Sequence, residues 1–452
     1  MNASVKCVGI FVLTLVALAV PRATTAAPRD ADVTFAKDIA PILQSKCQVC
    51  HREGSMAPMS LESYAQVRPW ARAIKSAVSS HEMPPWHLDK TVGIQAFAND
   101  RSLTEDQIDT IVRWVDAGAP MGDAADLPAP LEWPTGEDWN FSSMFGEPDL
   151  IVRSPAYTMP AQAQDVWYRP VVPTELTEAR WVRAIEIRPA TVKGRTITHH
   201  ALARLQQDEA SEAWQSNAPE DDLAIPSGLF MEWAIGKQGE LMRPDSGKLM
   251  LPGANIVWDI HYHAVGEEVT DQVELAVYFY PKGETPHFRQ RLGLYHAIAG
   301  GSGGLDIPPN TVTTHQGFHV MKEAGRIENF QPHMHLRGKG MMMEAILPDG
   351  RTDVLSHVAD YHFNWHNNYV YAEDAAPLLP KGTVLRFTSW HDNTAANRDN
   401  PDPNQWVGYG DRTVDEMAHA WVNITYMTDE DFEVEVAKRK AKLASTTTNE
   451  QP

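Results

Sequence analysis

Pairs of histidines separated by one residue occur twice in this 452-residue chain and supply its first chemical signal. His333 and His335 form one pair, and His261 and His263 form the other. In an extended strand, residues i and i+2 point to the same face, so each pair presents two imidazoles on one side. Two imidazoles on one face suit a chelated metal ion. A solvated strand face also produces such a pair by chance, so each pair alone leaves both interpretations open.

The adjacent histidines His199 and His200 have the opposite geometry, because neighbouring side chains on a regular strand face opposite ways. Both could bind one metal ion only if the strand is kinked there or the rings use different nitrogens. Taken alone, this pair fits one core histidine and one exposed histidine better than a metal site.

A different chemistry is indicated by Cys47-Gln48-Val49-Cys50-His51, the C-x-x-C-H pattern that attaches c-type haem. One helical turn presents two thiols to the haem vinyl groups, and the next residue places an imidazole beneath the iron. A thioredoxin-like pair requires a surrounding βαβ pattern, and a zinc knuckle requires a second C-x-x-C, and the sequence has neither. We therefore predict one covalent haem c held by Cys47, Cys50 and His51.

The sixth ligand of that haem iron has several candidates, among which Met83 is favoured. It precedes Pro84 and Pro85, which would keep its loop rigid. A thioether ligand there would raise the reduction potential. A methionine that only packs on the haem edge is the other interpretation of Met83. The rival ligands are Met56, Met59, His81 and His87.

Helical patterns flank the C-x-x-C-H segment. The stretch from Phe35 to Ser45 has an apolar face, and "SLTEDQIDTIVRWVDAGAP" begins with a Ser/Thr cap and an acidic first turn and ends at Gly118. Its apolar stripe contains Ile108, Ile111, Val112 and Val115. This pattern resembles the last helix of small cytochromes c, and residues 33–121 are predicted to form one such domain.

Composition and charge narrow the classes of function. Apolar residues make up 43% and charged residues 22%, which is ordinary for a soluble globular protein. A net charge of −20 argues against a nucleic-acid partner, because binding phosphates requires a basic face.

The N-terminus has the features of an export signal over residues 1–26. Lys6 precedes an apolar run from Val8 to Val20, and a small-residue cleavage site follows. The run is short for a membrane span, so we predict a periplasmic or secreted chain with no span in its mature form. Cys7 leaves with the signal, and the two cysteines that remain belong to the haem pattern, so no disulfide framework is expected.

From Leu150 onward the sequence consists of short alternating or β-branched runs separated by Gly, Pro and Asp turns, which favours β-sandwiches. The predicted fold is multidomain, with a small all-α cytochrome c domain followed by two all-β, jelly-roll-like sandwiches. The run Met341 to Met343 is expected to form a strand. Beyond 33–121, the expected divisions are a linker at 122–149, sandwiches at 150–288 and 289–430, and a charged tail at 431–452. The tail is expected to form a short helix at most and then to be disordered.

The ordered motifs of this half resemble the copper type II, ascorbate-dependent monooxygenases, which include dopamine β-monooxygenase and the peptidylglycine α-hydroxylating enzyme. The resemblance covers roughly Glu147 to Met427 and rests on "RAIEIRP…THHALARL", "IHYHA", "PHMHLRG", "FNWHNNY" and "TVDEM", in the family's order. It implies two sandwiches facing a solvent-filled cleft, with one copper on each. The implied ligands of the electron-transfer copper are His199, His200 and His261, and those of the oxygen-binding copper are His333, His335 and Met417. Imidazole with thioether is a soft donor set that favours Cu(I), which reacts with O₂.

This chain departs from the family in three ways. Its mature form has no disulfides. The positions that bind the substrate carboxylate in the amidating enzyme read Gln331, His419 and Trp421, so the resemblance implies a small substrate that is apolar or aromatic. The chain also carries its own haem pattern, and we expect this haem to replace ascorbate as the electron donor to the His199/His200/His261 copper.

The expected function is that of an exported copper monooxygenase that hydroxylates a C–H bond with O₂, with electrons passing from an external donor through the haem. One alternative is a multi-centre electron-transfer protein without hydroxylase activity, and another is a cytochrome fused to a binding sandwich with incidental histidines. His263 is expected beside the site or on the surface. Structural roles are expected for His357, His362, His366, His391 and His419.

Overall fold

The computed structural model describes residues 33–55, 57–133, 138–208, 228–234, 237 and 239–449. The predicted export signal and the candidate ligand Met56 lie outside these residues. Over the described part, the chain is mostly β-strand with few helices, as the short alternating runs predicted. None of its described helices is long and apolar enough to cross a membrane.

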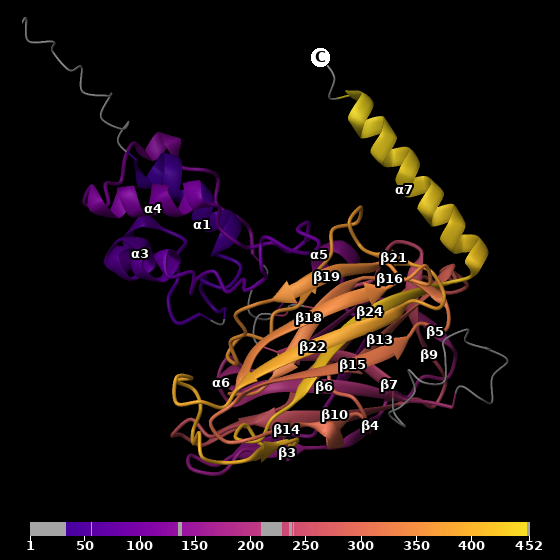
Figure 1. Ribbon diagram of the computed structural model, residues 1–452. Helices are drawn as coiled ribbons and strands as arrows, with labels where there is room; N and C mark the ends of the chain where they lie inside the picture. The colour runs from indigo at the N-terminus through magenta and orange to yellow at the C-terminus, as the bar shows by residue number, and fades with distance from the viewer. Residues whose placement is uncertain are drawn as a thin grey trace, which may run out of the picture.

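The described chain begins with a small helical unit, grouped to one side of the β layers (Figure 1). Thr104 caps the last helix through a capping box with Gln107, and Ile108 and Ile111 are buried on the predicted stripe together with Trp114. Gly118 follows that helix with a φ of +89°, a backbone conformation that glycine adopts without strain. The elements are a π-helical turn at Phe35–Ile39, α1 (Ala40–Lys46), α2 (Tyr64–Val67), a 3-10 turn at Arg68–Trp70, α3 (Ala71–Ser79) and α4 (Glu105–Asp116).

Two sheets form the first sandwich, around a core that includes Ile185, Met231 and Trp258. One sheet has the order β1-β12-β5-β9 with β8 beside β5, and the other has the order β3-β10-β6-β7 with β4 beside β10. A short helix, α6 (Gly194–Ile197), precedes β6, and β2 (Tyr157–Met159) pairs with β11 (Val269–Asp271). The strands are β1 (Leu150–Arg153), β3 (Val166–Tyr168), β4 (Val171–Pro173), β5 (Arg180–Pro189), β6 (Thr198–Gln206), β7 (Gly228–Ala234), β8 (Glu240–Leu241), β9 (Ser246–Met250), β10 (Asn255–Tyr262) and β12 (Val273–Phe279).

The second sandwich has a core that includes Phe330, Met341, Met343 and Phe387, so the methionine run does form a strand, β18. One sheet contains β13, β24, β16, β17, β20 and β21, and the facing sheet has the order β15-β22-β18-β19. Its strands are β13 (Phe288–His296), β15 (Val312–Val320), β16 (Ala324–Ile327), β17 (Asn329–Met334), β18 (Gly338–Ile346), β19 (Thr352–Val358), β20 (Tyr369–Val370), β21 (Leu378–Leu379), β22 (Val384–Asp392) and β24 (Ala418–Met427). Outside these sheets lie a 3-10 turn at Ser302–Gly304 and the pair β14 (Asp306–Ile307) and β23 (Val407–Gly408).

The two sandwiches pack directly against each other. On β24, Ala418 and Ala420 face the second core, whereas Trp421 packs against Leu202 of β6 and Leu292 of β13. A parallel pairing of β9 with β13 joins one sheet of each sandwich into an 11-stranded sheet. The inner faces of β6-β7 and of β17-β24 therefore meet in the middle of the molecule.

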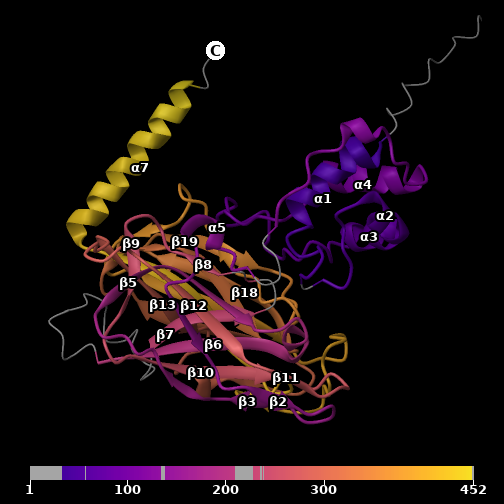
Figure 2. The ribbon, with the colours of Figure 1, turned by 180° about the vertical axis from the view of Figure 1, so that it is seen from behind.

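The chain between α3 and α4 attaches the helical unit to the second sandwich. Leu88 forms a β-bridge with Val358, and Phe97 forms one with Tyr371. Asn99 donates a hydrogen bond to the carbonyl of Asn368 (2.7 Å). Figure 2 shows the helical unit from the other side, again lying beside the β layers.

Part of the segment predicted as a linker is packed against the first sandwich. It contains a 3-10 turn at Ala124–Asp126 and α5 (Ser142–Phe145). Trp139 is buried against Ala184 and Tyr278, and the backbone N–H groups of Asn140 and Phe141 donate to the carboxylate of Glu186, both at 2.8 Å. These contacts order the residues just before β1.

The prediction of a short helix and a disordered tail was wrong. The tail forms α7 (Asp429–Asn449), which projects from the β body in Figure 1. Thr428 caps its start by accepting a hydrogen bond from the N–H of Asp431, and Arg439 and Lys442 bond to Ala376 and Asp374 of the body. The low apolar content suggested disorder, but strong helix formers, a cap and these anchors stabilise the helix.

Candidate functional site

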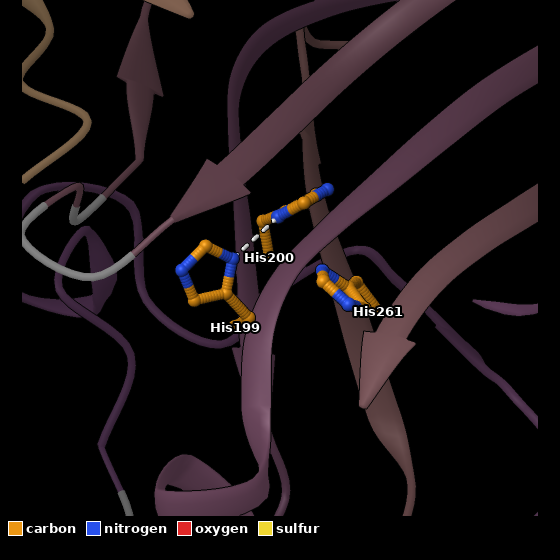
Figure 3. A group of neighbouring side chains, drawn as sticks. All are labelled: His199, His200 and His261. Atoms are coloured by element: carbon orange, nitrogen blue, oxygen red, sulfur yellow. Dashed lines mark hydrogen bonds between the residues drawn. The ribbon is translucent and has the colours of Figure 1, made fainter. Parts of the chain in front are cut away.

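A β-bulge brings His199, His200 and His261 together. His261 of β10 pairs with His200 of β6, whereas the next residue, Tyr262, pairs with Thr198, so His199 has no partner in the ladder. This extra residue re-aims one side chain, which is the kink that two adjacent histidines need in order to share a site. The Nδ1 atoms of His199 and His200 lie 3.0 Å apart (Figure 3).

The geometry of this trio fits one metal ion. Each histidine offers one ligand nitrogen, and these three nitrogens lie within 4.8 Å of one another. Ligand nitrogens bound to one ion at about 2.0 Å would be separated by about 3.5 Å, so small side-chain movements would complete the site. His261 places its Nε2 3.1 Å from Asp165, and its buried Nδ1 has no hydrogen-bond partner among the described residues. That nitrogen is available for a metal.

Burial keeps these imidazoles neutral. Desolvation is the main cause that lowers the pKa of His199 to about 3, and the neighbouring His261 contributes a smaller lowering. Desolvation also lowers the pKa of His200 well below its ordinary value. Burial also lowers the pKa of His261, against the opposing effect of Asp165. Neutral imidazoles offer lone pairs to a metal at neutral pH.

The second predicted group lies on the inner face of β17 and β24. His333 pairs with His419 and Met334 pairs with Ala418, so the same antiparallel register, continued by one residue, sets His335 opposite Met417. Directly opposite residues share a face, as do residues i and i+2. His333, His335, Met417 and His419 therefore belong to one face. Met334 lies on the other face, in the second core.

Glu416, which sequence reasoning passed over, holds His335 and Met417 in this arrangement. Its buried carboxylate accepts the backbone N–H of His335 at 2.9 Å and that of Met417 at 3.3 Å. The Nδ1 of His335 lies 3.1 Å from the carbonyl oxygen of Asp415, and a hydrogen bond there leaves Nε2 with the lone pair. The acidic pair before Met417 was visible in the sequence, but its partners were not.

The two histidine groups are in ring contact. The ring centroids of His200 and His333 lie 5.6 Å apart, so the solvent-filled cleft implied by the family resemblance is closed at this point. The histidines that face each other between the two sandwiches are buried, namely His200, His261, His333, His335 and His419. The metal ligands predicted for two separate sites thus form one continuous cluster.

His366 joins this cluster, although it was predicted to be structural. Its ring lies 4.6 Å from that of His333, 5.3 Å from that of His199 and 6.0 Å from that of His200. Its Nδ1 is 3.2 Å from the Nδ1 of His333, and its buried Nε2 has no partner within the described chain. The motif "FNWHNNY" carried this residue, but its place on an irregular turn gave no periodicity to read.

The other histidines singled out in the sequence lie at different distances from this cluster. The ring of His419 lies 4.8 Å from that of His333, and both of its buried ring nitrogens lack partners among the described residues. The ring of His263 lies 6.3 Å from that of His199, beside the cluster. His391 lies behind Met417, with its Nε2 3.2 Å from the carbonyl of Met417. His357 and His362 lie outside the cluster, beside Asp89 and Asp360.

The positions that differ from the amidating enzyme border the cluster. Gln331 donates from Nε2 to Glu232 at 2.7 Å and to the carbonyl of His366 at 3.2 Å. Glu232 also contacts Lys237, so Gln331 is engaged in a buried charged network. The ring centroid of Trp421 lies 4.8 Å from that of His333, with the rings tilted by 38°. Gln331, Trp421 and His419 together present an amide and two rings, without a cation that could bind a carboxylate.

A cavity of about 320 Å³ surrounds the C-x-x-C-H segment. Both thiols are free, and burial raises the pKa of Cys47 to about 12 and raises that of Cys50. The Nδ1 of His51 lies 3.3 Å from the carbonyl of Met59, and a hydrogen bond there makes Nε2 the lone-pair nitrogen. Apolar side chains such as Ile74 and Val78 line the walls. Two free thiols, a neutral imidazole and apolar walls fit a covalently held haem.

Two of the sixth-ligand candidates line this cavity, Met59 and Met83. His81 and His87 are not among its lining residues. The ring of His87 instead lies 4.6 Å from that of His362, on the side of the second sandwich. The placement of Met83 agrees with its predicted role but does not distinguish it from Met59.

No protein-family model matches this chain, and no curated protein matches it by sequence. Among solved structures, the major capsid protein P2 of bacteriophage PM2 aligns over 62% of this chain and 99% of its own, with 9% identity and a TM-score of 0.26. A structure of infectious bursal disease virus, Gx strain, aligns over 63% of this chain and 76% of its own, with 11% identity and a TM-score of 0.16. These scores are too low to indicate a shared fold.

Proposed function

We propose that this protein is an exported copper-dependent monooxygenase that hydroxylates a C–H bond of a small organic substrate with O₂ and receives electrons through its own haem c. The observation that carries the proposal is the position of the turn at Trp365-His366. Trp365 lines the C-x-x-C-H cavity, and His366 contacts both histidine groups. A site for single-electron chemistry thus adjoins a site rich in neutral imidazoles.

Copper bound at this cluster would supply one-electron redox chemistry and reactivity toward O₂. The electron-transfer copper would be held by His199, His200 and His261, and the oxygen-binding copper by His333, His335 and Met417. A haem bound by Cys47, Cys50 and His51, with Met83 as the sixth ligand, would supply electrons singly. Over the whole reaction one oxygen atom enters the substrate and the other leaves as water, with two electrons and two protons consumed.

The chain's own residues would orient the ligands and exclude water. Asp165 and the carbonyl of Asp415 orient His261 and His335, and Glu416 fixes the backbone on both sides of the second group. Trp421 and Phe363 cover the cluster with aromatic rings. None of Gln331, His419 and Trp421 is itself a cation, and Lys237, which contacts Gln331 at 3.4 Å, is already paired with Glu232 and Glu240. The substrate we propose is therefore apolar or aromatic.

One observation favours a second candidate, a multi-centre electron-transfer protein without hydroxylase activity. The histidine groups of the two sandwiches are in ring contact, which suits electron exchange between metals but leaves little room for a substrate. The two candidates differ in the fate of O₂, since only a monooxygenase transfers an oxygen atom to an organic molecule.

The test is elemental analysis of protein matured in an exporting, copper-replete host, followed by turnover with ¹⁸O₂ and a panel of small aromatic substrates. The monooxygenase predicts two coppers per haem and ¹⁸O in a product. His335→Ala should lose one copper and all product, whereas the matched control His362→Ala should keep both. Two coppers without labelled product would favour the electron-transfer protein. No copper with intact haem would favour a cytochrome fused to a binding sandwich.

A further inference from the structure

We propose that the turn from Phe363 to Asn367 is the electron route between the C-x-x-C-H cavity and the histidine cluster. Trp365 is its residue on the cavity side, and His366 is its residue on the cluster side. The inference rests on the proposed function in one respect, because it takes the cavity to hold haem and the cluster to hold copper.

The cavity side of the turn is defined by the residues that line the cavity. All the other lining residues of the described chain lie between Lys46 and Arg101, and Trp365 alone comes from the second sandwich. Met83 and Pro85 also line this cavity. A haem in this cavity would therefore meet the β body at Trp365.

The cluster side of the turn follows immediately in the chain. His366 is buried, with its ring 4.6 Å from His333 and 5.3 Å from His199, so it touches the ligand set predicted for each copper. Phe363, on the other end of the turn, stacks 4.8 Å from His199 at an interplanar angle of 20°. One peptide bond thus links the aromatic group at the cavity to the imidazole at the cluster.

Hydrogen bonds hold the turn against both neighbours. Asn367 donates from Nδ2 to the carbonyl of Pro85 in the cavity wall at 2.7 Å. Gln331 donates to the carbonyl of His366 at 3.2 Å, and the N–H of Trp365 donates to the carbonyl of His362 at 2.9 Å. A route fixed at both ends keeps a constant separation between donor and acceptor, which electron tunnelling requires.

The step is a transfer of one electron without a proton. Haem held by Cys47, Cys50 and His51 would give up one electron as its iron passed from ferrous to ferric, and copper held in the histidine cluster would accept it as Cu(II) became Cu(I). Trp365 stays chemically unchanged, so it is a positioning residue that couples the two sites. Two such transfers, with the haem reduced again between them by the external donor, supply the electrons for one O₂.

A rival route exists at another contact. Arg195, four residues before His199, donates to the carbonyl of Gly54, three residues after His51, at 2.8 Å. This contact joins the two sites through a half-buried side chain that carries no aromatic ring. Substitutions at Trp365 and Arg195 therefore separate the two routes.

The experiment injects one electron into the haem of the fully oxidised protein by flash photolysis of a flavin, without O₂, and follows haem re-oxidation optically. In Trp365→Leu we expect the rate of haem re-oxidation to fall by about tenfold or more, equivalent to about 1.4 kcal/mol in the barrier. The rate in Trp365→Phe should lie between those of Trp365→Leu and the unsubstituted chain. Haem content, haem midpoint potential and copper content should stay unchanged. Copper-free protein should show no re-oxidation.

Two matched variants sharpen the result. Trp390→Leu removes a half-buried tryptophan of β22 that does not line the cavity, and Arg195→Gln removes the rival contact. Both should transfer electrons at the unsubstituted rate. If Trp365→Leu transfers as fast as the unsubstituted chain, the route is wrong while haem-to-copper transfer stands. If the copper-loaded, unsubstituted protein shows no re-oxidation, both the route and the haem's proposed role fail.

Discussion

Each buried imidazole between the two sandwiches has a free-energy cost unless its nitrogens find partners, since an unsatisfied buried polar group costs about 1–3 kcal/mol. His261, His366 and His419 each have at least one buried ring nitrogen without a hydrogen-bond partner among the described residues. Their concentration at one interface is hard to explain by packing, because leucine or phenylalanine would fill the same space without that cost. A bound metal would offset the cost at the ligand positions.

His261→Ala should remove one of the two proposed coppers and leave the other. Copper that binds only the folded state stabilises it by about 2.7 kcal/mol at a concentration one hundred times its dissociation constant. We therefore expect copper to raise the melting temperature of the unsubstituted protein, and the variant to show a clearly smaller rise. Calorimetry with and without copper measures both. His362→Ala, which changes an exposed histidine, should behave like the unsubstituted protein, and an equal copper effect in His261→Ala would exclude this site.

His419→Leu should stabilise the copper-free protein. Both ring nitrogens of His419 are buried without partners among the described residues, so replacing it with an apolar side chain of similar size removes an uncompensated desolvation cost of about 1 kcal/mol or more. Urea unfolding of copper-free samples measures the change. The control is His391→Leu, which loses the contact between Nε2 and the carbonyl of Met417 and should be destabilised. Destabilisation by His419→Leu would mean that this histidine has a structural role.

At the scale of elements, strand periodicity predicted the faces well but not the irregularities. Alternation predicted His333 and His335 on one face, and their ring centroids lie 5.4 Å apart, with the register of β17 against β24 unbroken up to Met334. The position of His199 depends on a bulge set by the pairing with β10, and no local pattern encodes a register shift in a neighbouring strand. His366 was missed for a related reason, since it lies on a turn whose shape is fixed by contacts with Pro85 and Gln331.

Gly317 of β15 should not tolerate alanine, because this strand passes very close to the backbone of β13. A Cβ atom at Gly317 would lie 1.8 Å from the carbonyl oxygen of His296, and a backbone atom in a paired strand cannot move aside easily. We expect Gly317→Ala to lose about 3 kcal/mol or more of stability, measured by urea unfolding, or to fail to accumulate in soluble form. Gly228→Ala on β7 is the matched control, since the nearest atom to its Cβ is 4.0 Å away. Equal stability of the two variants would contradict the close approach.

At the scale of the whole molecule, the sequence predicted a helical unit and a β-rich half but not how they meet. The contact depends on the stretch between α3 and α4, where Leu88 and Phe97 bridge to strands of the second sandwich. Side chains from partners more than two hundred residues apart complete it, as in the bond from Asn367 to Pro85. Contacts of such long range leave no periodic signal in either segment. Trp365 of the second sandwich lines the cavity of the helical unit, so docking and the proposed electron supply depend on one interface.

Acidification should loosen this interface through His87. Burial lowers the pKa of His87 from 6.5 to about 4. The neighbouring His362 lowers this pKa further, and Asp360 has a smaller, opposing effect. An undocked His87 binds a proton near pH 6.5, whereas the docked one does so only near pH 4, so the docked state loses stability as the pH falls between these values. Near pH 4, the docked state has lost stability on the order of 3 kcal/mol relative to neutral pH.

Hydrogen exchange measures this loss at the amides of Asp89, Ile94 and Ala98, which donate across the interface. After correction for intrinsic exchange, their protection should fall between pH 7 and about pH 4.5 while that of the strand cores holds. His87→Phe has no proton to bind and should keep its protection at the lower pH. His81→Asn, which changes an exposed histidine at a φ of 56° that asparagine tolerates, should respond like the unsubstituted chain. If His87→Phe loses protection to the same extent, another group controls the docking of the helical unit.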